Sequence, residues 1–230
     1  MRGGPWFCDP DAAADTAIDV DVDGATGSDR LGDTGSVERI GIFGGTFDPP
    51  HNGHVAAAVQ VRHALGLDRV IVVVANDPWQ KQSDSISPPD VRLRLARAAF
   101  AGLEGIEVSD IEIRRGGATF TIDTVEAMRV GPVQLVVVIG SDAAAGLPTW
   151  HRASDLAAIV EFAVVTREGS PESTARVLPP GFSGRLVPIT RLDVSSTHVR
   201  RRVLAGEPID GLVPPPVVRE IGHSRLYTGT

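Results

Sequence analysis

Residues 39–54 read RIGIFGGTFDPPHNGH, and they contain the first turn of the predicted sheet. It opens with a short apolar run, RIGIF, which is typical of a β-strand, and the run ends in the glycine pair Gly44-Gly45. From His54 to Leu67, apolar residues recur at spacings of three and four, which predicts a helix. The opening unit is therefore expected to be a strand, a glycine turn and a helix.

The rest of the chain repeats this alternation. Apolar runs predict strands at 69–75, 106–114, 134–140, 158–166 and 185–189, while helical spacing predicts helices at 88–103, at 121–129, and from near Ser195 and near Pro214. Strands separated by helix-length segments imply right-handed crossovers and a doubly wound, mainly parallel α/β sheet of Rossmann-like type. Because ligands of such sheets bind beyond the carboxyl ends of the strands, the turn after the first strand is a candidate site.

Composition excludes several classes of protein. The chain has 230 residues, of which 42% are hydrophobic, enough for one sizeable core. Its single cysteine, Cys8, excludes an intramolecular disulfide framework and a thiolate zinc site. There is no run of about 18 apolar residues, and the N-terminus turns acidic where a signal peptide needs an apolar stretch. We therefore expect a cytoplasmic protein with no membrane partner.

Charge divides the chain into two parts. Residues 1–38 hold nine acidic side chains against two arginines, which accounts for the whole net charge of −7. Residues 1–36 are therefore interpreted as an acidic, disordered tail, because they lack apolar periodicity, and 37–230 as a single domain. The tail is either a functional acidic segment or the product of a start site placed too far upstream. The balanced charge of 39–230 offers no basic field for nucleic acid.

The turn after the first strand carries the features of a phosphate site. Paired glycines let a phosphate approach the backbone, and the following helix offers free N–H groups with partial positive charge. His51 and His54 are three residues apart at that helix end and share a face. Taken alone, such a histidine pair is more often a surface feature or a partial metal site than a phosphate clamp, although no nearby third ligand completes a zinc set.

Two motifs together carry a resemblance to a known family. GGTFDPPHNGH (44–54) resembles the first signature of the nucleotidyltransferases that use an HxGH motif, and VSSTHVR (194–200) resembles their second signature. From about Val37 to the end, the chain is most similar to the nicotinate-nucleotide adenylyltransferases, with support from TFTIDT (119–124), QLVVVIGSD (134–142) and LPTW (147–150). Phosphopantetheine adenylyltransferases and cytidylyltransferases are the alternatives within the superfamily.

This resemblance implies a nucleotidyltransferase fold and a reaction of NAD biosynthesis. Nicotinic acid mononucleotide would attack the α-phosphorus of ATP, giving nicotinic acid adenine dinucleotide and pyrophosphate. Magnesium is expected on the ATP phosphates, bound mainly by the substrate and water. The alternatives are an adenylyltransferase that acts on nicotinamide mononucleotide or phosphopantetheine, or a nucleotide-sensing module without turnover. Homo-oligomerisation is left open.

The family pattern also implies a set of site residues. Catalytic roles fall to His51, His54, Arg200 and Lys81. Nicotinic acid mononucleotide would be bound by Thr121, Asp123 and Trp150, and ATP by Gly44, Thr46, Phe47, His51, His54, Asp142, Ser196, Thr197 and Arg200. Ser196 and Thr197 would also cap their helix, and plain N-capping is the alternative for residues 195–197. Asp142 is alternatively an ordinary strand-end aspartate, and Trp150 a core residue.

The chain departs from the family pattern at two positions. Before Lys81, its only lysine, it carries Gln80 where the family often has histidine. After Trp150 it carries His151 where related sequences often have tyrosine. The function of the missing imidazole would pass to Gln80 or Trp79, or be dispensed with.

Overall fold

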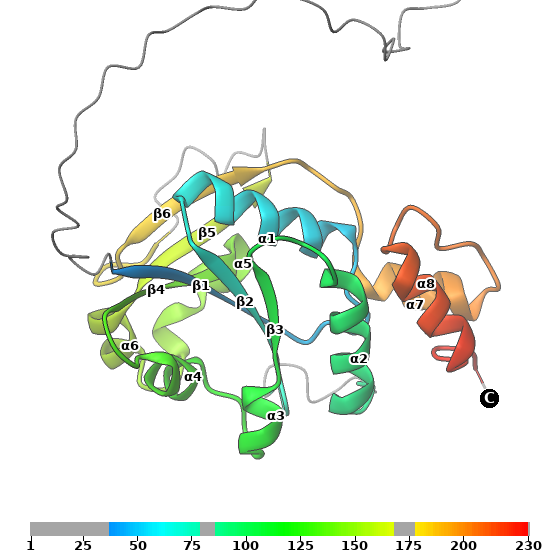
Figure 1. Ribbon diagram of the computed structural model, residues 1–230, viewed down its shortest axis with the longest axis horizontal. Coiled ribbons are helices and arrows are strands. Elements are labelled where there is room, and N and C mark those ends of the chain that lie inside the picture. The colour runs from blue at the N-terminus through cyan, green and yellow to red at the C-terminus, as the bar shows by residue number, and fades with distance from the viewer. Residues whose placement is uncertain (1–36, 79–85, 168–177, 230) are drawn as a thin grey trace, which may run out of the picture. The chain divides into compact units, whose positions relative to one another are not determined.

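The computed structural model describes residues 37–78, 86–167 and 178–229 (Figure 1). The tail 1–36, with Cys8, and the segment that holds Trp79, Gln80 and Lys81 lie outside the described residues. Residues Gly35–Thr230 group into one compact unit, and the division of the chain at residue 36 stays a prediction.

A six-stranded sheet forms the centre of this unit. Its strands are β1 (Glu38–Gly45), β2 (Arg69–Val74), β3 (Ile106–Ser109), β4 (Val133–Gly140), β5 (Glu161–Arg167) and β6 (Gly184–Ile189). Their order in the sheet is β3-β2-β1-β4-β5-β6, and every neighbouring pair is parallel. The order reverses between β1 and β4, so the switch point of a doubly wound sheet lies beyond these two strands. The predicted fold class is confirmed.

Helices cover both faces of the sheet (Figure 1). They are α1 (Asn52–Leu65), α2 (Pro89–Phe100), α3 (Ile111–Arg115), α4 (Thr121–Met128), α5 (Ser141–Ala145), α6 (Ala153–Ile159), α7 (Ser196–Leu204) and α8 (Pro215–His223), with a 3-10 turn, η2 (Leu147–Thr149). Buried residues of α1, α2, α7 and α8 form one core, and those of α4, α5 and α6 form a second.

Strand β4 supplies both cores. Val136 and Val138 belong to the first core, and Leu135, Val137 and Ile139 to the second. Successive side chains of a strand point to opposite faces, so an unbroken apolar run marks a strand that is covered on both sides. None of the helices in the described part of the chain is long and apolar enough to cross a membrane.

Two predicted strands are wrong in extent. Residues 106–114 do not form one strand, because β3 ends at Ser109 and α3 begins at Ile111. The Ser109 hydroxyl accepts the Ile111 N–H at 3.3 Å, which starts the turn, and Arg114 N–H donates to the Asp110 carbonyl at 2.9 Å. Likewise 158–166 is split, because 158–159 end α6 and β5 begins at Glu161.

Candidate active site

The turn between β1 and α1 is built around the buried ring of Phe47. A Cβ atom on Gly45 would lie only 2.7 Å from that ring, so a glycine is needed there for Phe47 to fold beneath the turn. The ring of Phe47 makes edge contacts with Phe43 and Phe100, at centroid distances of 5.7 and 6.1 Å. Because this side chain is in the core, only the backbone of Phe47 remains for the phosphate contact that the sequence predicted.

The two histidines of the turn lie against each other at the start of α1. Their rings stack with centroids 3.7 Å apart, and the main-chain N–H of His51 donates to His54 Nδ1 at 3.1 Å. With Nδ1 acting as an acceptor, neutral His54 carries its proton on Nε2. His51 is 9% exposed, and burial lowers its pKa to about 4, so its imidazole is neutral at neutral pH. The edge of Phe47 supports the His54 ring at 5.1 Å.

Helix α7 is fastened to this same turn. The Ser196 hydroxyl donates to the Pro49 carbonyl at 2.8 Å, and Arg200 Nη1 donates to the Asp48 carbonyl at 2.7 Å. The helix is capped by Ser195, whose hydroxyl accepts the His198 N–H at 3.1 Å. The expectation that Ser196 and Thr197 cap α7 is therefore wrong, because the chain turns into the helix one residue earlier and leaves the Ser196 hydroxyl for Pro49.

Together these elements enclose a cavity, here called the polar cavity. It is lined by Thr46, Asp48, His51, His54, Ile86, Ser195, Ser196, Thr197 and Arg200. Two imidazoles, a guanidinium and the N-terminus of a nine-residue helix thus face one space. Donors of this kind are suited to bind a polyanion such as a chain of phosphates.

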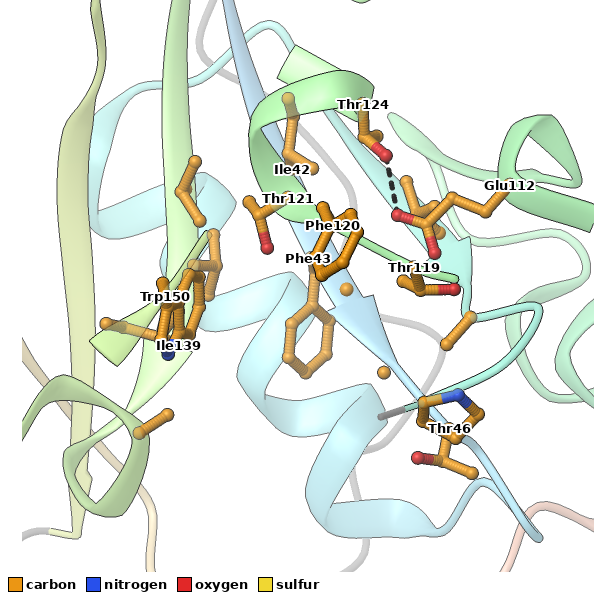
Figure 2. Close-up of a pocket in the computed structure, with 18 of the residues that line it drawn as sticks. Ile42, Phe43, Thr46, Glu112, Thr119, Phe120, Thr121, Thr124, Ile139 and Trp150 are labelled. Carbon is orange, nitrogen blue, oxygen red and sulfur yellow. Dashed lines mark hydrogen bonds between the residues drawn. The ribbon is translucent and has the colours of Figure 1, made fainter. Parts of the chain in front are cut away.

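A second cavity, here called the aromatic cavity, opens beyond the ends of β1 and β4 (Figure 2). Its lining includes Gly44, Phe43, Thr119, Phe120, Thr121, Trp150 and His151. The rings of Phe120 and His151 lie 4.3 Å apart, so the histidine that replaces the usual tyrosine still contributes a ring. Within the described residues, the buried Nε1 of Trp150 has no hydrogen-bond partner. Thr46 lines both cavities, so they meet at this residue.

Glu112 is a residue of the aromatic cavity that the sequence analysis missed. Its carboxyl group is buried and accepts the Thr124 hydroxyl at 2.6 Å, the bond drawn in Figure 2. Burial raises the pKa of Glu112, which favours the protonated, neutral acid. The signal in the sequence is an acidic residue within an apolar run, which reading 106–114 as one strand concealed.

Arg92 of α2 is the second residue that the sequence did not reveal. It is 1% exposed, and its guanidinium donates to four main-chain carbonyls, those of Thr46, Ala75, Asn76 and Ser87, over 2.6–3.0 Å. Thr46 follows β1, and Ala75 and Asn76 follow β2, so one buried cation ties the two strand ends that lie beneath the cavities. The periodic spacing of α2 gives no sign that one of its arginines faces inward.

Not every expected residue reaches the cavities. Asp142 is exposed in the first turn of α5, and half-buried Asp123 lies in the first turn of α4; neither lines a cavity. Lys81 lies outside the described residues. The roles assigned to these three residues stay predictions.

Comparison with known proteins places this architecture among relatives. A family model described as cytidylyltransferase-like matches residues 42–202. A protein of Corynebacterium kroppenstedtii named "Probable nicotinate-nucleotide adenylyltransferase" is 37% identical over 191 residues, covering 82% of this chain and 90% of its own. One of the same name from Bordetella pertussis is 39% identical over 196 residues, covering 83% and 98%.

The fold also matches solved structures. The nicotinic acid mononucleotide adenylyltransferase of Plasmodium falciparum, complexed with NaAD, superimposes with a TM-score of 0.67 at 19% identity. That match covers 83% of this chain and 97% of the other. At such low identity the likeness concerns the fold alone.

Proposed function

The chain belongs to the nicotinate-nucleotide adenylyltransferases within the cytidylyltransferase-like family, and we propose that it transfers the adenylyl group of ATP to nicotinic acid mononucleotide. The products are nicotinic acid adenine dinucleotide and pyrophosphate, in a step of NAD biosynthesis. The observation that carries this proposal is the meeting of the polar cavity and the aromatic cavity at Thr46, beyond the switch point of the sheet.

The polar cavity is proposed to bind the phosphates of ATP. His51, His54 and Arg200 would contact them, with Ser196, Thr197 and the α7 N-terminus on the other side. The site needs no general base, because the attacking phosphate monoester has a second pKa of about 6 and is already largely a dianion. Its oxygen bonds to the α-phosphorus while the α–β bridging oxygen leaves with pyrophosphate. The side chains supply position and charge stabilisation.

The aromatic cavity is proposed to bind the mononucleotide. Trp150 and Phe120 offer faces for a pyridine ring, and the hydroxyl of Thr121 lies beside them (Figure 2). The buried indole N–H of Trp150 needs an acceptor, and a carboxylate or an amide carbonyl of the substrate could supply one. Gly44 leaves room where a Cβ would meet no atom within 4 Å.

Magnesium fits this site as a companion of ATP. Among the described residues, no group of three or more His, Cys, Asp or Glu side chains could hold a metal ion. Asp48 lines the polar cavity, but its carboxylate already accepts the Ser87 N–H at 3.0 Å. Oxygens of the substrate phosphates and water would therefore be the ligands, and the cation would neutralise charge on the leaving pyrophosphate.

A competition assay tests the proposal. The purified full chain is given ATP, magnesium and equal amounts of the acid and amide mononucleotides, and the dinucleotide products are separated by mass. We expect the acid dinucleotide and an equal amount of pyrophosphate. Preference for the amide would overturn the substrate assignment, and the same assay with phosphopantetheine tests the remaining alternative. Binding of ATP without any product would instead indicate a nucleotide-sensing module.

A further inference from the structure

A tyrosine that follows α8 reaches the wall of the polar cavity. Tyr227 Oη donates to Asp48 Oδ1 at 2.6 Å, across 179 positions of sequence. The other oxygen of this carboxylate, Oδ2, accepts the Ser87 N–H at 3.0 Å. Asp48 is 4% exposed and lines the polar cavity, so both of its oxygens are held by donors at the edge of the proposed phosphate site.

A carboxylate at this position is a hazard for ATP binding. Two negative groups a few ångströms apart repel each other, most strongly where protein excludes water. Arg200 already contacts the main-chain carbonyl of Asp48 at 2.7 Å, so a carboxylate that lost its donors would have a guanidinium beside it. A salt bridge formed there would remove positive charge from the cavity.

Tyr227 is well suited to hold this carboxylate. Burial, followed by its hydrogen bond to Asp48, raises the pKa of the Tyr227 phenol, so the group stays a proton donor across the neutral range. A hydrogen bond from a neutral donor to an ionised oxygen is short and strong, in keeping with the distance of 2.6 Å. The backbone of Tyr227 is left-handed, with φ of 63°, which is uncommon for a residue with a side chain.

We propose that Tyr227 is a positioning residue for ATP binding. The Tyr227 hydroxyl holds the Asp48 carboxylate away from the ATP phosphates and prevents it from pairing with Arg200. The inference rests on the proposed function of the polar cavity and adds to it a residue from the far end of the domain. Tyr227 lines neither cavity, so it acts through Asp48 and does not touch the nucleotide.

The variant Tyr227→Phe tests the proposal, because it removes one hydroxyl and keeps the ring. We expect KM for ATP to rise about tenfold, the size of effect that loss of a hydrogen bond to a charged group commonly has. We expect KM for nicotinic acid mononucleotide to stay within about twofold, since that substrate is assigned to the other cavity. Thr228→Val is the matched control: it removes an exposed hydroxyl that donates to the Arg225 carbonyl at 2.8 Å, and both constants should stay unchanged.

A second variant separates positioning from simple support of the fold. In Tyr227→Phe with Asp48→Asn, the amide carries no charge to repel phosphate or capture Arg200, so KM for ATP should return toward that of the unmodified chain. If Tyr227 merely supported the fold, the second change would add to the damage. Equal KM values in Tyr227→Phe and the unmodified chain, or an equal rise for both substrates, would overturn the inference.

Direct binding keeps the two proposals distinguishable. If the unmodified chain made no dinucleotide, the proposed function would be wrong. Kd values for ATP measured by calorimetry would still test the positioning role of Tyr227. About tenfold weaker ATP binding in Tyr227→Phe, reversed by Asp48→Asn, supports the positioning role. Identical Kd values in the three proteins refute it.

Discussion

The two histidines of the first turn differ in environment although they are stacked. His51 is buried and its imidazole is neutral, while its main-chain N–H fixes the ring of His54 by donating to Nδ1. The Nε2–H of His54 is thereby a donor of fixed direction. Such a donor is most useful where negative charge develops during a reaction, because it need not reorganise at that moment. The His54 imidazole is thus oriented by the main-chain N–H of His51 and by stacking on the His51 ring.

The variant His54→Ala tests the role of the oriented ring. We expect kcat to fall at least about a hundredfold, as loss of one fixed donor to a developing charge does in other enzymes. His63→Ala provides the control, because that exposed histidine lies in the last turn of the same helix. Circular dichroism should be unchanged in both variants. An activity of His54→Ala within threefold of the unmodified chain would remove this residue from the mechanism.

Burial of His51 makes stability depend on pH. The unfolded chain protonates this histidine near pH 6.5 and the folded chain only near 4, so the folded state loses stability as the pH falls through that window. Between pH 7 and 5 this one group lowers the free energy of unfolding by about 2 kcal/mol. Urea unfolding at the two pH values should show a loss smaller by that amount in His51→Asn. Equal losses in both proteins would contradict burial as the cause.

Among the elements, α7 and α2 hold in place the turn that carries the histidines. Helix α7 joins the first turn through Ser196 and Arg200, and α2 sends Arg92 beneath the ends of β1 and β2. A guanidinium suits this position because its several donors can satisfy carbonyls from different directions at once. The main chain that faces both cavities is thus held from below by a cation.

Replacing this guanidinium tests that arrangement. Arg92→Lys keeps the charge but offers a compact ammonium that cannot reach four carbonyls, so we expect the free energy of unfolding to fall by about 3 kcal/mol. Arg94→Lys on the same helix is the control, because Arg94 is half exposed and its ion pairs with Asp90 and Glu220 contribute about 1 kcal/mol at most. Equal unfolding midpoints for the two variants would show that the hydrogen bonds of Arg92 do not stabilise the strand ends.

In the whole unit, the switch between β1 and β4 brings distant segments to one edge. The histidines follow β1, Trp150 lies ten residues after β4, and Arg200 follows the last strand of the sheet. Because all six strands are parallel, their carboxyl ends share that edge, and the loops after them can line adjoining cavities. The two cavities are a consequence of the topology.

The folded unit is expected not to need residues 1–36. The sheet begins at Glu38, whose N–H donates to the Pro132 carbonyl at 3.1 Å, so the strand is anchored without the preceding segment. We expect a chain that starts at Val37 to keep its melting temperature within about 2 °C and its kcat/KM within about twofold. Scanning calorimetry and the adenylyl-transfer assay would measure both. A large loss of either would assign these residues to the folded domain.

Local patterns in the sequence were enough to predict the alternation of strands and helices, the doubly wound sheet and the two signature motifs. A run such as QLVVVIG predicts by its own composition that its strand is buried on both faces, because such a strand needs apolar residues at nearly every position. The predicted strand at 106–114 was wrong because apolar residues also alternate in α3, although the alternation shifts by one residue at Ser109-Asp110, where hydrogen bonds turn the chain.

How the site is held together depends on tertiary contacts that the sequence does not reveal. Arg92, Glu112 and Tyr227 bear on the cavities through partners 12 to 179 positions away. Glu112 leaves a weak local signal, an acidic residue within an apolar run, but no local pattern marks Arg92 or Tyr227. The physical reason is that hydrophobic periodicity records which face of an element is buried, whereas the value of a buried polar group depends on the partner that folding brings to it.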